Sequence, residues 1–295
     1  MDEGYPPPRP EESGLIRVLA PNPSPMTGAG TNSFVVGHGD VAVIDPGPAI
    51  PAHLDALLAA VAGRPVRAIL VTHSHLDHSP AARHLADRLG GVEVLAFGSP
   101  DAGRSGTMRR LAGLGGGEGV DADFIPDRRL VTGDTVAGDG WTLRAHHTPG
   151  HMANHLSFEW MEARAVFTGD TVMGWASTMI SPPDGDLGQF MASLDRLENL
   201  DARRFHPGHG PSVDDPGARC RDLRAHRLAR EAAIFAALPD APTIPALVAR
   251  IYVDTPPALH PAAARNVLAH LVHLVETGRV RADPHPRPDA RYVQM

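Results

Sequence analysis

A short stretch near residue 75 concentrates side chains that bind metal ions. The mostly apolar run 66–71 leads directly into His73, His75, Asp77 and His78. Alternate residues of an extended chain point the same way, so His73 and His75 can share one target, and the turn that follows can aim Asp77 and His78 at a neighbouring point. Imidazole and carboxylate groups together suit Zn²⁺, Mn²⁺ or Fe²⁺. The pattern therefore predicts a metal site rather than a loop of surface histidines.

Three later segments repeat this arrangement, each with a potential ligand after an apolar run. His151, Asp170 and His209 each follow a glycine, which allows a tight turn and a close backbone approach. Each segment taken alone is more typical of a turn or a helix cap. Together with the first motif they complete a set of seven donors: His73, His75, Asp77, His78, His151, Asp170 and His209. Seven donors suit two metal ions that share one bridging carboxylate.

The composition is that of a slightly acidic protein with enough apolar residues for a large core. Of 295 residues, 42% are hydrophobic, and 27 basic against 34 acidic residues give a net charge of −7. This balance excludes a generally basic nucleic-acid-binding surface, although it allows a local patch. The single cysteine, Cys220, excludes an intramolecular disulfide and a zinc site built from cysteines.

The N-terminal residues and the hydropathy of the chain predict a cytoplasmic protein. The first residues, MDEGYPPP, lack the basic and apolar regions of a signal peptide. No apolar run reaches the roughly 18 residues that a membrane-spanning helix needs. We therefore expect no membrane partner.

Short strands and helices must position the seven donors. Apolar runs predict strands at 15–19, 33–36, 41–44, 66–71, 92–97, 141–145, 155–159, 165–168 and 203–206, and helical spacing predicts helices over 51–61, 80–89 and 189–197. Residues 98–119 are rich in glycine, which predicts a mobile loop whose part in substrate binding the sequence leaves open.

The pattern changes near residue 217, where helices replace strands. Helices are predicted over 219–238, 244–253 and 261–276, followed by a two-stranded ribbon at 279–282 and 291–294. This order is typical of a winged helix. We therefore predict two domains, a hydrolase domain over 1–217 and a helical, winged-helix-like domain over 218–295.

The motifs resemble those of the metallo-β-lactamase fold superfamily. The resemblance covers roughly residues 14–213 and rests on the run from His73 to His78 and on the Gly-His, Gly-Asp and Gly-His pairs that end at His151, Asp170 and His209. It implies an α/β protein, an αββα sandwich with metal ions at one edge of two packed sheets. The small winged-helix-like domain would follow this sandwich.

The resemblance also implies how the donors divide between two divalent metal ions. His73, His75 and His151 would bind the first ion, Asp77, His78 and His209 would bind the second, and Asp170 would bridge them. Zn²⁺ is the metal we expect, and Mn²⁺ or Fe²⁺ also suits such a ligand set.

Asp170 and two further stretches indicate which branch of the superfamily the sequence resembles. The true β-lactamases of the superfamily have a cysteine or serine where Asp170 stands, so antibiotic hydrolysis is not the expected main activity. Residues 15–33 and 169–174 resemble the family of the endoribonuclease β-lactamase-like protein 2, which also has a C-terminal winged helix. His155 matches that family too, whereas His206 departs from its usual tyrosine.

Such a site implies hydrolysis by a hydroxide held between the two metal ions. Asp77 would bind one metal and orient the hydroxide. His155 would donate a hydrogen bond to the developing oxyanion or to the leaving group. The alternative is a structural role, in which His155 makes its hydrogen bonds within the protein.

Two substrate classes are compatible with the sequence. Endoribonuclease or other phosphodiesterase activity on single-stranded RNA is one prediction. The alternative is a thioester or small-ester hydrolase of the hydroxyacylglutathione hydrolase or lactonase type. From Thr243 to Met295, six arginines stand against four acidic residues, a small excess for gripping phosphates. The C-terminal domain could instead serve packing or a homodimer. A winged-helix binding or regulatory protein is the alternative from another functional class.

Overall fold

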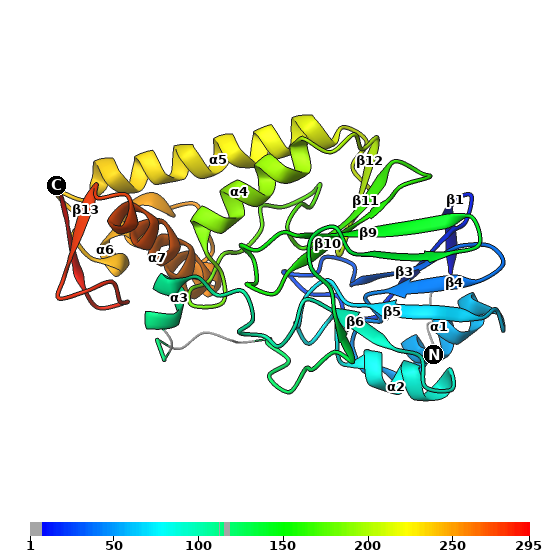
Figure 1. The fold of residues 1–295 in the computed structure, drawn as a ribbon. Coiled ribbons are helices and arrows are strands. Elements are labelled where there is room, and N and C mark those ends of the chain that lie inside the picture. Colours follow the sequence, from blue (N-terminus) through cyan, green and yellow to red (C-terminus); the bar gives the residue numbers. More distant parts are fainter. Residues whose placement is uncertain (1–7, 112, 115–118) are drawn as a thin grey trace.

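Two face-to-face β-sheets form the centre of the larger part of the protein (Figure 1). The computed structural model describes residues 8–111, 113–114 and 119–295. The first sheet has seven strands in the order β1-β2-β3-β4-β5-β6-β7: Arg9–Glu12, Leu15–Leu19, Asn32–Val36, Val41–Ile44, Val66–Leu70, Val94–Ala96 and Arg128–Arg129. The second has five in the order β12-β11-β10-β9-β8: Arg204–Pro207, Ala165–Gly169, Leu156–Trp160, Trp141–His147 and Thr135–Gly138.

Helices cover the outer face of each sheet, which confirms the expected αββα sandwich. Helices α1 (Pro51–Val61) and α2 (Ala81–Arg88) cover the first sheet, and α4 (Leu187–Glu198) with the start of α5 (Pro216–Ala237) covers the second (Figure 1). The period of two in β3 explains the layering. Phe34 and Val36 pack between the sheets, while Val35 packs toward the helices. All five residues of β3 are buried, as expected for a strand covered on both faces.

The proposed donors lie at one edge of this sandwich because the strands before them end there. Strand β4 is parallel to β5, and β11 is parallel to β12. Strands β9 and β11 both run antiparallel to β10, so they share a direction. Parallel strands present their carboxyl ends at the same edge. The segments that follow β9, β11 and β12 therefore lie at one edge of the second sheet, and the contact of His75 with His151 shows that the segment after β5 meets them there.

The C-terminal region forms the predicted helices and ribbon. Helices α5, α6 (Ile244–Ile251) and α7 (His260–Glu276) are followed by the antiparallel pair β13 (Val280–Asp283) and β14 (Arg291–Gln294). A short 3₁₀ turn, Pro257–Leu259, precedes α7. These elements enclose their own apolar core, which includes Leu247, Leu271 and Tyr292.

Helix α5 belongs to both packing regions. Cys220 and Leu223, near its start, pack with α4 against the second sheet, whereas Ile234 and Ala237, near its end, pack in the C-terminal core. At about 1.5 Å per residue, such a helix is roughly 33 Å long. The proposed domain boundary at 217 falls in its first turn.

Part of the segment 98–119 forms structure where a loop is predicted. Helix α3 (Gly106–Arg110) is capped by Ser105, whose side chain accepts a hydrogen bond from the backbone N–H of Met108. Met108 and Leu111 pack into the C-terminal core, and this burial explains why a short glycine-flanked sequence becomes helical. Residues 112 and 115–118 of the segment lie outside the described residues. No helix in the described part of the chain could cross a membrane.

Candidate metal centre

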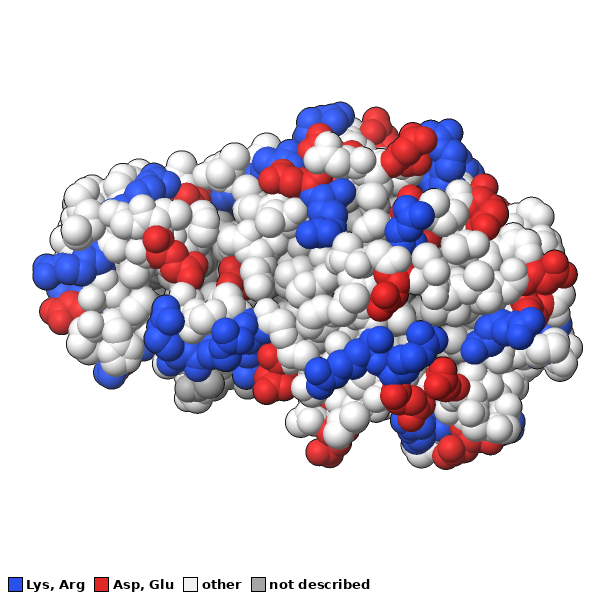
Figure 2. Space-filling model, in the orientation of Figure 1, with Lys and Arg blue, Asp and Glu red and all other residues white. Residues whose placement is uncertain are grey.

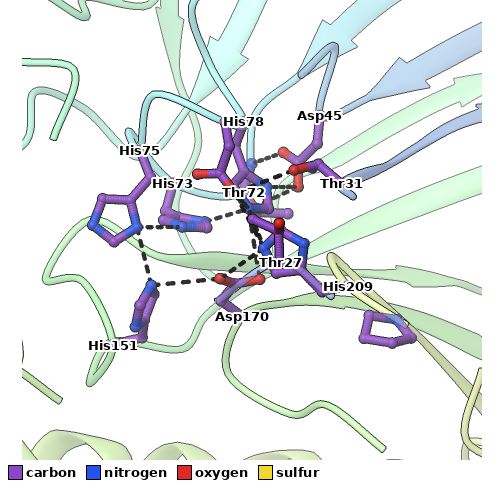
Figure 3. A network of polar contacts seen from close by, with 12 residues as sticks. Thr27, Thr31, Asp45, Thr72, His73, His75, His78, His151, Asp170 and His209 are labelled. Atoms are coloured by element: carbon purple, nitrogen blue, oxygen red, sulfur yellow. Dashed lines mark hydrogen bonds and ion pairs between the residues drawn. The ribbon is translucent and has the colours of Figure 1, made fainter. Parts of the chain in front are cut away.

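Three histidines converge on one point at the sheet edge (Figure 3). Nδ1 of His75 lies 3.0 Å from Nε2 of His73 and 3.0 Å from Nε2 of His151. His73 and His75 follow β5, while His151 follows β9. Nitrogen ligands of a tetrahedral Zn²⁺ lie about 3.3 Å apart when each Zn–N bond is about 2.0 Å. The spacing of the three nitrogens suits one metal ion.

A second group lies beside the first. Nε2 of His209 lies 3.2 Å from Oδ2 of Asp77 and 3.4 Å from Nε2 of His78. His78 Nε2 is 3.5 Å from the same Asp77 oxygen. The three atoms therefore form a second compact set of possible ligands.

Asp170 lies between the two groups, as Figure 3 shows. Its Oδ2 is 3.3 Å from Nε2 of His209 and 3.6 Å from Nε2 of His151, and its Oδ1 is 3.6 Å from Nε2 of His78. Oδ1 is buried and accepts no hydrogen bond from the described residues. A buried carboxylate oxygen without a hydrogen bond is costly unless another group, such as a cation, satisfies it. The donor set therefore fits two divalent cations joined through Asp170.

Glycine is required where the second sheet approaches this carboxylate. A Cβ atom on Gly208 would lie 2.6 Å from Oδ1 of Asp170 and 2.7 Å from Cε1 of His78. Gly169 has a φ of +47°, and a Cβ there would lie 2.5 Å from Nε2 of His155. The glycines that precede the donors thus allow close backbone approach, as the sequence predicts.

Asp45 fixes the orientation of two of these histidines. Its Oδ2 accepts hydrogen bonds from Nδ1 of His78 at 2.9 Å and from the hydroxyl of Thr72 at 2.7 Å. Because that hydroxyl donates to Asp45, it accepts from Nδ1 of His73, which lies 3.0 Å away. Both imidazoles therefore direct Nε2 toward the metal centre. Carboxylates that hold metal-binding histidines in this way also raise their basicity.

Backbone carbonyl groups orient two other histidines. His151 donates from Nδ1 to the carbonyl oxygen of Met179 at 2.8 Å, and His209 donates from Nδ1 to that of Gly30 at 3.2 Å. Thr31 donates from Oγ1 to Oδ2 of Asp77 at 3.2 Å. These contacts leave the opposite ring nitrogens free to act as ligands.

Without a metal ion, the histidines of the two proposed metal-binding groups differ in their protonation. Burial, helped by neighbouring imidazoles, holds the pKa of His73 well below its usual value and lowers that of His75 to about 3. Burial would also lower the pKa of His78 and His209, but nearby carboxylates outweigh it and raise these values to about 9 and about 11. The first group therefore offers neutral imidazoles, whereas a metal ion in the second must displace protons.

His155 lies behind the metal centre, with no exposed surface. Its Nε2 accepts a hydrogen bond from the backbone N–H of Asp170 at 3.1 Å, so its Nδ1 carries the proton and lies 3.0 Å from Oγ1 of Thr148. Burial keeps its pKa well below the usual value. Both nitrogens are used within the protein, and the ring does not line the pocket. This placement disagrees with the predicted role of His155 as a donor to the substrate.

His206 also points away from the pocket. Its Nε2 bonds to Glu12 and its Nδ1 to Ser212, both at 2.9 Å, and the ring stacks on Phe167. It therefore joins β1 to β12 rather than contacting a substrate.

A pocket of about 310 Å³ opens over the metal centre. Among its described lining residues, the titratable side chains are His75, Asp77, His151, Asp170 and His209, all of them predicted ligands. The rest of the lining is formed by Pro25, Met26, Thr27, Gly119, Met173, Trp175, Ala176, Ser177 and Met179. No described arginine contributes to it.

The structure thus brings all seven predicted donors together and adds residues that the sequence analysis missed. Asp45 follows the apolar strand β4 just as the donors follow theirs, so the same rule could have identified it. Thr72 directly precedes His73 but has no distinguishing feature in the sequence. Met179 acts through its carbonyl oxygen, which no side-chain pattern can reveal.

Comparisons with known families agree with this geometry. Residues 26–209 match the family described as the Metallo-beta-lactamase superfamily. Residues 243–286 match the Beta-lactamase associated winged helix domain.

Individual relatives extend the match over most of the chain. A Beta-lactamase-like protein 2 homolog from Caenorhabditis elegans is 31% identical over 275 residues, covering 92% of this chain and 87% of that protein. An Atrochrysone carboxyl ACP thioesterase from Aspergillus chevalieri is 31% identical over 227 residues, and the match covers 76% of this chain and 65% of the thioesterase. The crystal structure of a metallo-beta-lactamase family protein from Thermus thermophilus has a TM-score of 0.76 at 27% identity, with 96% and 99% of the two chains covered.

Proposed function

This chain belongs to the metallo-beta-lactamase superfamily of metal-dependent hydrolases, and we propose that its substrate is a thioester with an apolar acyl group. The observation that carries this proposal is the pocket above the metal centre. Its walls are apolar, and every titratable group in its described lining is a proposed metal ligand. Water would add to the carbonyl carbon and the C–S bond would break, giving a carboxylic acid and a thiol.

The proposed metal ligands are the seven donors at the sheet edge. His73, His75 and His151 would hold one divalent ion, Asp77, His78 and His209 a second, and Asp170 would contact both. Zn²⁺ is the metal we propose, because imidazole and carboxylate ligands suit it, and Mn²⁺ or Fe²⁺ are the alternatives. When bound, such ions polarise a substrate carbonyl and supply an activated water.

The role that we assign to Asp77 is to orient the attacking water. Burial alone would raise its pKa, but the charge of His78 and the hydrogen bond from His209 hold the pKa below the usual range. The carboxylate therefore stays ionised at neutral pH, and it lines the pocket. Thr31 fixes one of its oxygens by a hydrogen bond.

The walls of the pocket suit an apolar acyl group. Met26 and Trp175 line it while keeping 51% and 43% of their surface exposed, and Met173 and Met179 complete the apolar side. Methionine and tryptophan adapt to or stack on apolar groups, and a substrate that buries them removes apolar surface from water.

The chemistry of the leaving group also favours a thioester. Thiols have a pKa of about 8.5, so a thiolate can leave without a proton donor. An alkoxide leaving group is far more basic and needs a general acid. His155 is buried behind the metal centre and cannot serve as this acid. Every titratable side chain in the described lining of the pocket is a proposed metal ligand, so the lining offers no separate general acid.

The arginines of the C-terminal region give little support to an RNA substrate. Arg250, Arg279 and Arg287 each pair with a carboxylate, at 3.1, 2.8 and 2.5 Å. On the face shown in Figure 2, basic side chains form a row across the lower half of the view, with acidic side chains beside it, above and below. Phosphate binding requires basic groups that remain free to contact the backbone of the nucleic acid. The thioesterase name of one relative is consistent with the proposal.

The direct test compares substrates on the metal-loaded protein. Acyl thioesters of one thiol, with acyl chains from two to about ten carbons, would be assayed beside a single-stranded RNA and a lactone. We expect thioester hydrolysis that a chelator abolishes, and kcat/KM that rises with chain length because each buried methylene contributes about 0.8 kcal/mol.

Two variants make this test specific. His75→Ala should abolish hydrolysis, whereas His84→Ala, which changes an exposed histidine on α2, should leave it unchanged. Chelator-sensitive cleavage of RNA without thioester hydrolysis would refute the proposed substrate and favour a nuclease. A lactone hydrolysed far faster than every thioester would also refute it.

A further inference from the structure

A segment without regular secondary structure, residues 178–181, lies between the metal centre and the C-terminal helices. It follows the pocket residues Trp175, Ala176 and Ser177, and its own Met179 lines the pocket. Thr178 and Ile180 are buried, with 1% and 0% of their surface exposed. We call this segment the connecting segment.

On one side, the connecting segment bonds to two proposed metal ligands. The hydroxyl of Thr178 donates to the carbonyl oxygens of Asp170 at 2.8 Å and Thr171 at 3.0 Å. The carbonyl oxygen of Met179 accepts from Nδ1 of His151 at 2.8 Å. The segment thereby fixes the backbone that carries Asp170 and the ring orientation of His151.

On its other side, the connecting segment bonds to α5 and α7. Arg227 of α5 donates from Nη2 to the carbonyl oxygen of Thr178, and from Nη1 to Oδ1 of Asn266 at 3.2 Å. The same oxygen of Asn266, on α7, accepts from the backbone N–H of Ile180 at 3.3 Å. Arg265, one residue earlier on α7, donates from Nε to Oγ of Ser181 at 2.9 Å.

Arg227 is an unusual residue to find in this position. Only 4% of its surface is exposed, and its guanidinium lies 5.4 Å from the centre of the Phe190 ring. Burying a guanidinium is costly unless its N–H groups are satisfied. Its two Nη atoms donate to Thr178 and to Asn266, whereas its buried Nε has no partner among the described residues. The contacts that offset the burial of this charge are therefore the ones that fix the connecting segment.

We propose that Arg227 and Asn266 are positioning residues for the metal centre: through the connecting segment, α5 and α7 hold Asp170 and His151 in place. The route from Arg227 to Asp170 passes through one residue, Thr178. The C-terminal helices would therefore act on the chemistry as well as on access to the pocket. This inference rests on the proposed metal ligands but not on the identity of the substrate.

The test measures metal affinity by competition with a chromophoric chelator on the full-length protein, beside kcat and KM. Outer contacts that orient metal ligands are typically worth 10- to 100-fold in metal affinity or activity. We expect Arg227→Met and Thr178→Val to weaken metal binding by about 10-fold or more and to lower kcat more than they raise KM. Thr178→Ser keeps the hydroxyl and should restore both.

The matched control is Arg230→Met, the same change one turn later on α5, where the guanidinium packs 4.3 Å from the centre of the Tyr252 ring. It should leave metal affinity unchanged. If Arg227→Met does not fold, Asn266→Ala and Thr178→Val decide the question. Wild-type metal affinity in the folded variants would overturn the proposal, and this result would be independent of which substrate the enzyme hydrolyses.

Discussion

Asp45 connects two proposed metal ligands although it is not a ligand itself. It accepts hydrogen bonds from His78 and Thr72, and Thr72 in turn accepts from His73. Its backbone has a φ of +48°, a conformation that is uncommon outside glycine and that such a network must hold in place. One carboxylate thus orients a histidine in each proposed metal group.

Asp45→Asn tests this role with little change in shape. An amide cannot supply the negative charge that supports His78, so we expect metal affinity to fall by about 10- to 100-fold. Chelator competition would measure it. Asp55→Asn, which changes an exposed carboxylate on α1, is the control. Equal metal affinity in both variants would contradict the orienting role of Asp45.

Gly208→Ala tests the close packing of the metal centre. The new Cβ would lie within 2.6 Å of Asp170 Oδ1 and 2.7 Å of His78, and both side chains are buried. We expect the variant to bind less than the full complement of metal, because Asp170 and His78 must move apart. Metal content would be measured by elemental analysis after gel filtration. Gly188→Ala, where the nearest atom lies at 3.4 Å, should keep its metal. Full metal content in Gly208→Ala would refute the argument.

The convergence of the seven proposed donors at one sheet edge could be predicted from the sequence, because the residue types that bind metals are few and each segment that carries them follows an apolar strand. The inward placement of the His155 ring could not be predicted from the sequence. The family resemblance predicts a hydrogen-bond donor to the substrate at this position, but the ring turns inward and accepts a hydrogen bond from the backbone N–H of Asp170. Only the direction of the side chain, which depends on how β10 pairs with β9, separates these two roles.

At the scale of elements, α5 joins the sandwich to the C-terminal core. Glu231, in its second half, accepts hydrogen bonds from His273 of α7 at 2.7 Å and Arg279 at 2.8 Å, and only 7% of its surface is exposed. This cluster joins α5 to α7 and to the start of the C-terminal ribbon.

The His273–Glu231 pair predicts a pH dependence of stability. The hydrogen bond to Glu231 raises the pKa of His273 above its usual value. A raised pKa stabilises the fold fully below the unfolded value of about 6.5, and this contribution is lost as the pH rises through the folded value. We expect urea unfolding to show a stability that falls as the pH rises above the unfolded value of about 6.5, and a smaller fall in His273→Gln. Identical pH profiles would show that the pair contributes nothing.

Most strands, the large helices and the winged-helix order could be predicted because each has a clear apolar pattern, whereas the short or exposed strands β1, β7 and β8 could not. Helix α3 could not, since its five residues gain their stability from Met108 and the neighbouring Leu111 packing on a distant core. The role of the connecting segment could not be predicted from the sequence either. Its partners Arg227 and Asn266 lie 49 and 86 residues from the atoms they contact. Hydrogen bonds between a side chain and the backbone of a segment so far away in the chain leave no recognisable pattern in the local sequence.

At the scale of the whole molecule, charge weighs against nucleic-acid binding. The net charge is −7, and three of the six arginines after Thr243 pair with acidic residues. Arg265 donates a hydrogen bond to Ser181 of the connecting segment. A nucleic acid would therefore meet few free cationic groups in this region.

This charge distribution predicts weak binding to single-stranded RNA. Without several free arginines, few counterions are released, and we expect a Kd no tighter than about 10⁻⁴ M at physiological salt. Fluorescence anisotropy with a labelled oligonucleotide would measure it at several salt concentrations. Submicromolar binding with a steep salt dependence would contradict the prediction.

The central claim is that the sheet edge holds two metal ions and that hydrolysis depends on both. The most direct measurement titrates metal-free protein with Zn²⁺ while bound metal and hydrolysis of a medium-chain acyl thioester are followed together. We expect no hydrolysis without metal and a rate that reaches its plateau as the second equivalent of Zn²⁺ binds. Full activity in the metal-free protein, or a plateau at one equivalent with Asp170→Asn as active as the wild type, would contradict it.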